Sequence, residues 1–91
     1  MNQYYTLSTA AVMDTAISLM QENGTTTTLE VKRSLRNQGY WAVQATVSRL
    51  MQYLAIEFGW DFFDTGRFRL YFMDHETEEN EEAPVVELYL N

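Results

Sequence analysis

The sequence predicts an α+β fold in which three helices precede a two-stranded hairpin. Apolar residues recur at three- and four-residue spacing in three successive segments before residue 56, which is the period of a helix. After that point apolar residues alternate with their neighbours, which is the period of a strand. At 91 residues and 46% hydrophobic, the chain is long enough for one small domain and too short for two ordinary ones.

The first helix is expected between Leu7 and Asn23, where the apolar side chains follow the helical period. Ser8 is suited to the N-cap position, and Gly24 is suited to end the helix. The next four residues, 25–28, are all threonine, and their β-branched side chains favour a short extended segment before the second helix.

The second helix is expected to start near Thr27 and to run to about Asn37, with Gly39 placed to end it. Thr27 stands three residues before Glu30, which is the spacing of a capping box. In that arrangement each of the two side chains accepts a hydrogen bond from the backbone N–H of the other residue.

The two faces of this second helix differ in character. Leu35 is expected to be buried together with an apolar residue from earlier in the helix, either Leu29 or Val31. Three basic residues face outward in this arrangement, where they could bind phosphate: Lys32, Arg33 and Arg36.

A turn is expected at residues 39–41, followed by a third helix over residues 43–55. Its apolar residues follow the pattern i, i+4, i+7, i+8, i+11, which places one face in the core. The opposite face is polar and remains available to a partner. The residues of the apolar stripe are Val43, Val47, Leu50, Met51 and Leu54.

Two strands are expected after the third helix, at residues 56–63 and 67–72, with the turn residues 64–66 between them. Because the tip has three residues in this prediction, the register of the strands is fixed. Phe58, Trp60 and Phe62 would lie opposite Phe72, Leu70 and Phe68, and Asp61 would lie opposite Arg69.

Helix, short strand, helix, helix, strand, loop and strand is the element order of a winged helix-turn-helix, whose wing is the hairpin. The predicted winged-helix domain covers residues 1–73. Residues 74–91 are expected to form an acidic tail, in which a linker precedes a short strand-like segment at residues 85–90.

The formal charge of −7 is unevenly distributed along the chain. All the basic residues lie between positions 32 and 69, whereas residues 74–91 contain acidic residues and no lysine or arginine. We favour a solvated tail that keeps the protein soluble. Two alternatives remain open: the tail could compete with phosphate for the basic segment, or it could bind a partner protein.

Several classes of function are disfavoured by what the sequence lacks. It contains no cysteine for a disulfide or thiolate site, and its one histidine, His75, has no second histidine or cysteine as a partner, so we expect no metal and no cofactor. It also lacks a membrane span, a signal peptide and a recognisable catalytic constellation. We therefore expect a cytoplasmic protein that is not an enzyme.

The most specific motif is Gly39-Tyr40, followed after a short gap by Gln44-Ala45-Thr46-Val47-Ser48-Arg49. It resembles the helix-turn-helix of the arginine repressor family, whose DNA-binding domains typically read Gly-Tyr, a gap, and Gln-Ala-Thr-Val-Ser-Arg. The resemblance covers roughly residues 8–73. It implies a winged-helix domain whose third helix enters the major groove of double-stranded DNA.

By this resemblance the candidates for base or phosphate contact are Gln44, Ser48 and Arg49, with Thr46 nearby. Residue chemistry points to the same face, because Gln44 and Ser48 are four residues apart, as are Ala45 and Arg49. Glutamine pairs with adenine and arginine with guanine, while a small alanine permits close approach. Flanking phosphate contacts are expected from Lys32, Arg33, Arg36 and Arg67.

Two features depart from the family pattern. Val43 stands where the family usually has a capping threonine, and Asp61 and Asp64 lie on or near the wing, where carboxylates repel phosphate. The leading prediction is a small DNA-binding protein that regulates transcription, and we expect it to dimerise. The alternative is a protein-interaction module of the same fold, such as a small acidic inhibitor or assembly factor, that does not bind DNA.

Overall fold

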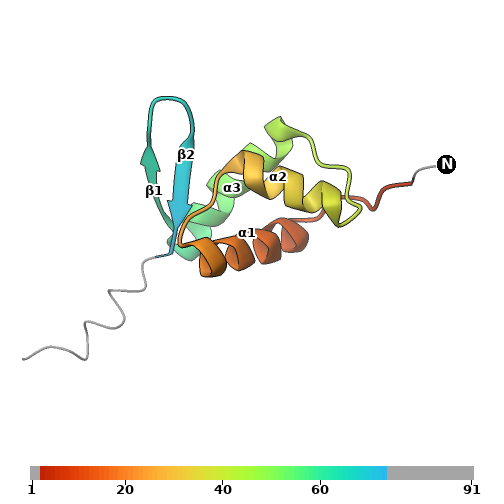
Figure 1. The fold of residues 1–91 in the computed structure, drawn as a ribbon, viewed down its shortest axis with the longest axis horizontal. Coiled ribbons are helices and arrows are strands. Elements are labelled where there is room, and N and C mark those ends of the chain that lie inside the picture. The colour runs from red at the N-terminus through yellow and green to blue at the C-terminus, as the bar shows by residue number, and fades with distance from the viewer. Residues whose placement is uncertain (1–2, 74–91) are drawn as a thin grey trace, which may run out of the picture.

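The structure, a computed structural model, describes residues 3–73, which form three helices and an antiparallel hairpin (Figure 1). The α+β class is confirmed, and the arrangement is compatible with a winged helix in which the hairpin is the wing. The predicted acidic linker and the segment at residues 85–90 lie outside the described residues. The elements are α1 (Thr9–Asn23), α2 (Thr28–Asn37), α3 (Gln44–Phe58), β1 (Asp61–Asp64) and β2 (Arg69–Phe72).

α1 begins and ends where the sequence predicts. The Ser8 hydroxyl accepts a hydrogen bond from the Ala11 N–H at 3.1 Å, which satisfies one of the backbone donors that every helix leaves open at its start. Gly24 follows the last turn with a φ of 87°, a conformation that glycine adopts readily because it has no Cβ. Both helix ends are therefore fixed by local chemistry.

The capping box predicted at the start of α2 is only half formed. The Thr27 hydroxyl accepts from the Glu30 N–H at 3.1 Å, as expected. The Glu30 carboxylate, however, accepts from the Thr26 hydroxyl at 3.1 Å, so the predicted return bond to Thr27 is wrong. Thr26 is fully buried, and a buried hydroxyl without a hydrogen-bond partner is costly. The bond from the Thr26 hydroxyl to the Glu30 carboxylate avoids that cost.

α3 is longer than predicted, because residues 56–58 continue the helix instead of starting a strand. Ile56 is 83% exposed, whereas Trp60 is buried beyond the helix end, so the apolar alternation in this segment does not mark one face of a strand. Gly59 ends α3 in the left-handed conformation, and the Trp60 N–H donates to the Ala55 carbonyl at 2.9 Å. The glycine decides where the helix ends.

Val43 is the N-cap of α3, and its side chain makes no hydrogen bond to the helix. It is 43% exposed and therefore does not belong to the buried stripe that the sequence predicts. The remainder of the stripe is confirmed, since Val47, Met51 and Leu54 are buried and Leu50 packs against them.

The wing has a different register from the predicted one. A three-residue tip would have placed Phe62 opposite Phe68 and Asp61 opposite Arg69, but residues 65–68 connect the strands instead. The observed pairs are Asp61 with Phe72, Phe62 with Tyr71, Phe63 with Leu70, and Asp64 with Arg69.

Hydrogen bonds within the wing tip explain this register. The Thr65 N–H donates to the Phe68 carbonyl at 2.9 Å, and the Thr65 hydroxyl accepts from the N–H groups of Arg67 and Phe68. Asp64 Oδ1 accepts from the Gly66 N–H at 2.9 Å, and Gly66 has a φ of 94°. Side-chain oxygens therefore select a tip centred on Gly66 and Arg67.

The shifted register changes which residue of β2 is buried. Tyr71 is 1% exposed, while Leu70 and Phe72, predicted to form the apolar face, are only partly buried. Tyr71 also exchanges two backbone hydrogen bonds with Thr26, at 2.9 and 2.8 Å. The extended segment predicted before α2 is thus confirmed at Thr26, and it attaches the wing to the helices.

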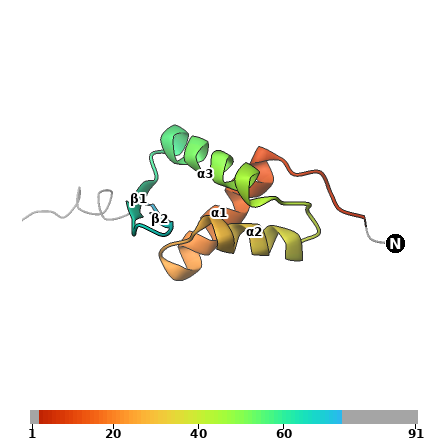
Figure 2. The same ribbon diagram turned by 90° about the horizontal axis from the view of Figure 1, so that it is seen from above.

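The three helices pack on one another, and the wing stands at one end of them (Figures 1 and 2). α2 contributes Val31 and Leu35 to the core, whereas Leu29 is 38% exposed, which decides between the two predicted alternatives. The core residues from the other two helices are Ala11, Val12, Ala16 and Met20 of α1, and Val47, Met51, Leu54 and Ala55 of α3.

We predict that Val43→Thr stabilises the protein. The N-cap backbone is already extended, and a threonine hydroxyl there can accept from a free N–H of the first helical turn, at a gain of about 1 kcal/mol in the free energy of unfolding. Thr27→Val is the matched control, because it removes the corresponding bond from α2 and should cost about as much. Urea unfolding measures both changes, and a less stable Val43→Thr variant would contradict the expectation.

Candidate nucleic-acid interface

An open groove of about 980 Å³ lies between the start of α2, the exposed face of α3 and the inner face of the wing. We call it the wing groove. It owes its shape to the backbone bonds between Thr26 and Tyr71, which hold β2 beside the start of α2. We define it by Arg33 of α2, by Gln44, Ala45 and Ser48 of α3, and by Arg67 and Arg69 of the wing.

The structure brings some of the predicted contact residues together in this groove and leaves others outside. Those within it are Arg33, Gln44, Ala45, Ser48 and Arg67. Arg49 is exposed one turn after Ala45, so it extends the surface of α3 beyond the groove. Thr46 and Lys32 are partly buried outside the groove, and Arg36 lies at the other end of α2.

Arg69 is a groove residue that the sequence did not reveal. The predicted register paired it with Asp61, whereas its carboxylate neighbour is Asp64, with Nε and Oδ2 3.8 Å apart. Its guanidinium carbon also lies 4.7 Å from the centre of the Phe62 ring. The register depends on hydrogen bonds within the tip, so the sequence pattern offers no signal that places this side chain on the inner face.

Cationic side chains outnumber free anionic ones in the wing groove. Arg33 and Arg67 have no carboxylate partner among residues 3–73. Of the two acidic residues that line the groove, Asp64 faces Arg69 and Glu30 accepts a hydrogen bond from a buried hydroxyl. The hydroxyl leaves the charge of Glu30 in place, so the groove holds three guanidinium groups and two carboxylates. An anion that enters it meets a net positive charge and two guanidinium groups without a carboxylate partner among the described residues, which suit the geometry of phosphate oxygens.

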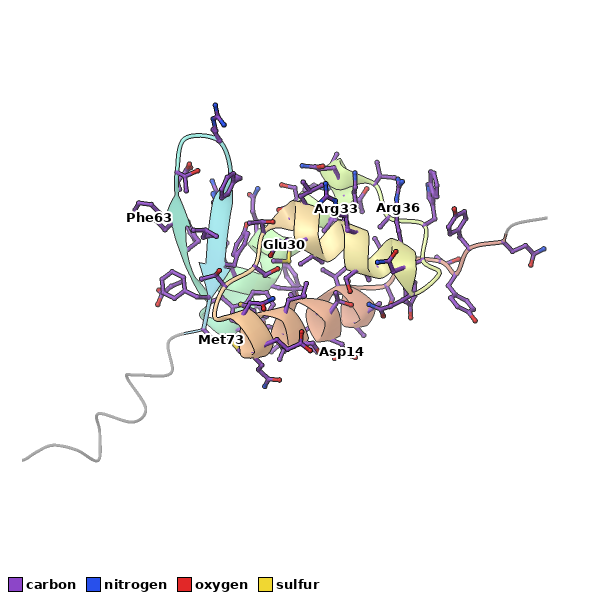
Figure 3. The ribbon with its side chains drawn as sticks, viewed as in Figure 1. Asp14, Glu30, Arg33, Arg36, Phe63 and Met73 are labelled. Carbon is purple, nitrogen blue, oxygen red and sulfur yellow. The ribbon has the colours of Figure 1, made fainter. Side chains whose placement is uncertain are left out.

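The arginines of α2 gather along one edge of the molecule. Figure 3 shows Arg33 and Arg36 on the upper edge of α2, the side toward which the tip of the wing extends. Asp14 of α1 lies on the opposite edge in the same view. The described residues therefore present a cationic edge that includes the wing groove.

Arg36 is held in position at this edge. Its Nε–H donates to the Ala42 carbonyl at 2.8 Å, and its guanidinium carbon lies 4.7 Å from the centre of the Trp41 ring. Arginine has five N–H donors, and the bond to Ala42 uses one of them. Arg36 thus fixes the turn between α2 and α3, a role that the sequence analysis did not predict, and it retains donors for a ligand.

Comparisons with models of protein families, with curated proteins and with solved structures found no match to this chain. Within the described part of the chain, no three histidine, cysteine, aspartate or glutamate side chains gather as metal ligands. No helix among residues 3–73 is long and apolar enough to span a bilayer. What the site can bind follows from its own geometry.

We expect Arg36→Met to lower the free energy of unfolding by about 1 kcal/mol, because it removes the bond to Ala42 and the contact with Trp41. Arg33→Met is the matched control on the same helix. Arg33 has no hydrogen-bond or ion-pair partner among the described residues, so its replacement should change stability by less than about 0.5 kcal/mol. Urea unfolding distinguishes the two variants. Equal free energies of unfolding for Arg36→Met and Arg33→Met would show that the Arg36 contacts do not stabilise the turn.

Proposed function

We propose that this protein binds duplex DNA, with the exposed face of α3 in the major groove and the wing against the neighbouring backbone. One observation carries the proposal: three elements direct polar groups and arginines into the same open groove. Gln44 and Ser48 line it from α3, and Arg33 and Arg67 line it from α2 and the wing. The likeness of residues 39–49 to the helix-turn-helix of arginine repressors supports the same use of α3.

The α3 side chains in and beside the wing groove suit the edges of base pairs. The Gln44 amide can pair with adenine through one donor and one acceptor. The Ser48 hydroxyl can either donate a hydrogen bond to a base edge or accept one from it. Ala45 is small enough for the base edges to approach, and Arg49 can pair with guanine through two donors. A helix face with this chemistry reads sequence, which is what a transcriptional regulator requires.

Arg33 and Arg67 supply the contacts that position the protein. Phosphate groups follow both edges of the major groove, so a helix inserted there has backbone phosphates within reach of its flanking elements. Each guanidinium group that neutralises a phosphate releases condensed counterions, which makes the affinity fall as salt concentration rises.

The shape of the surface favours B-form DNA over an RNA duplex. α3 has 15 residues, and the major groove of B-DNA, about 12 Å wide, admits a helix. The major groove of A-form RNA is deep and narrow, so side chains of α3 could not reach its bases. Because a single α3 reads one half-site, we propose that two copies bind a twofold-symmetric site.

A second candidate is a protein-interaction module of the same fold, and the outer side of the wing favours it. Phe63 points away from the helices in Figure 3 and is 62% exposed. β1 pairs only with β2 among the described residues, so its other edge is open to a strand from a partner protein. A protein that works only in this way would not bind DNA even at low salt.

Arg67→Ala should weaken binding to all duplexes about equally and should reduce the slope of log K against log salt by about 0.9, the contribution of one phosphate contact. Gln21→Glu is the control, because it lowers the net charge by the same unit at an exposed site on α1 outside the wing groove. Fluorescence anisotropy with a labelled blunt duplex, over a series of salt concentrations, measures both slopes. An unchanged slope in Arg67→Ala, or no binding by the wild type at low salt, would count against the proposal.

Asp64→Asn should tighten binding to any duplex by a few-fold, since it removes a negative charge from the groove within a Debye length of about 10 Å from the phosphates. The new side chain keeps an oxygen that can accept from the Gly66 N–H, so the wing tip should be preserved. Asp14→Asn makes the same chemical change on the opposite edge of the molecule (Figure 3). Anisotropy should show a gain for Asp64→Asn alone; equal gains would mean that only the net charge matters.

A further inference from the structure

We propose that a second surface, at the opposite end of α2 from the wing groove, stacks unpaired nucleobases, so that the preferred ligand is a duplex with a single-stranded extension. The inference rests on the DNA-binding function proposed above. The surface is a cluster of aromatic rings around one arginine at the far end of α2. We call it the aromatic platform and define it by Tyr4, Tyr5, Tyr40, Trp41 and Arg36.

Backbone hydrogen bonds assemble the platform. The Tyr5 N–H donates to the Gly39 carbonyl at 2.7 Å, and the Tyr5 carbonyl accepts from the Trp41 N–H at 3.1 Å, so the N-terminal segment lies along the turn between α2 and α3. Gly39 makes this approach possible, because it has a φ of 98° and a Cβ there would lie 3.3 Å from the Tyr5 ring. The rings are therefore positioned before any ligand arrives.

The rings contact one another yet keep much of their surface exposed. The centres of Tyr4 and Trp41 are 5.2 Å apart, and those of Tyr5 and Tyr40 are 5.6 Å apart. The exposed fractions are 49% for Tyr4, 67% for Tyr5 and 51% for Trp41. Aromatic side chains contribute most to stability when buried, so half-exposed rings held in one place indicate a surface that a partner covers.

The charge of the platform favours a nucleic acid as that partner. Arg36 lies over the Trp41 ring, and neither residues 3–8 nor residues 38–43 contain an acidic side chain. Exposed rings beside a guanidinium group are the combination that single-strand binding surfaces use, since the rings stack on bases while the cation attracts the backbone. In a duplex each base is covered by its neighbours, so the rings can reach only unpaired bases.

The platform and the wing groove share one edge of the molecule. Figure 3 shows Arg33, which lines the groove, and Arg36, which belongs to the platform, along the same edge of α2. Trp41 also lies three residues before Gln44, the first residue of α3. A strand that leaves a duplex held in the wing groove can therefore continue onto the platform.

The test compares the full-length protein on a blunt duplex and on the same duplex with an extension of four thymidines. Stacking of one base should make the extended duplex bind about fivefold more tightly or better. Trp41→Ala should lose this gain and keep its affinity for the blunt duplex. Tyr53→Ala is the matched control, because it removes a ring that is 53% exposed on α3, outside the platform, and should keep the gain. Thermal melting by circular dichroism checks that both variants fold.

Tryptophan fluorescence gives an independent measurement. Trp41 is half exposed, whereas the other tryptophan, Trp60, is 7% exposed, so an eight-residue oligothymidylate should quench the wild type. Trp41→Phe should lose the quenching and retain most of the gain from the extension, because the ring is preserved.

Equal affinity for the blunt and extended duplexes, or a gain that survives Trp41→Ala, overturns the inference and leaves the proposed function intact. A wild-type protein that binds neither duplex overturns both. Quenching by a proline-rich peptide and not by oligothymidylate would also overturn the inference and would assign the platform to a protein partner.

Discussion

The pair of backbone hydrogen bonds between Thr26 and Tyr71 is the contact on which the rest of the structure depends. An isolated two-stranded hairpin is marginally stable in water, and every residue of β1 is exposed. The wing is therefore held by β2, through the burial of Tyr71 and its two bonds to the segment before α2. These bonds set the distance between the wing and α2, and so they create the wing groove. The start of α2 is tied to the same point, because Glu30 accepts from the Thr26 hydroxyl.

A second backbone bridge fixes the other end of α2. Tyr5 pairs with Tyr40 there, as Thr26 pairs with Tyr71 at the start. α2 thus holds two segments that are distant in the sequence, the wing at one end and the N-terminal segment at the other. The proposed duplex site and the proposed single-strand site are attached to these two ends, so a ligand that spans both would lie along the cationic edge that carries Arg33 and Arg36 (Figure 3).

The surface is not optimised for stability alone. Phe62, Phe63 and Phe68 leave half or more of their area exposed on the wing, and α3 starts at Val43 without a side-chain cap. Burial of these aromatic rings, or a side-chain cap at the start of α3, would each increase the free energy of unfolding. The exposed rings and the uncapped helix start occur on the elements to which we assign contact with a partner, which is where natural proteins tolerate such losses of stability.

The sequence by itself determined the features that depend on neighbours along the chain. Ser8, Gly24 and Thr27 set helix ends because capping uses backbone groups within a few residues, and the spacing of Gln44, Ala45 and Ser48 placed them on the exposed face of α3. The tertiary structure decided the register of the wing, the partner of Glu30 and the position of Arg69. An alternating pattern says which side chains share a face but not how far one strand slides along the other. That choice, and with it the wing groove, rests on hydrogen bonds in the wing tip and on the distant pairing of Thr26 with Tyr71.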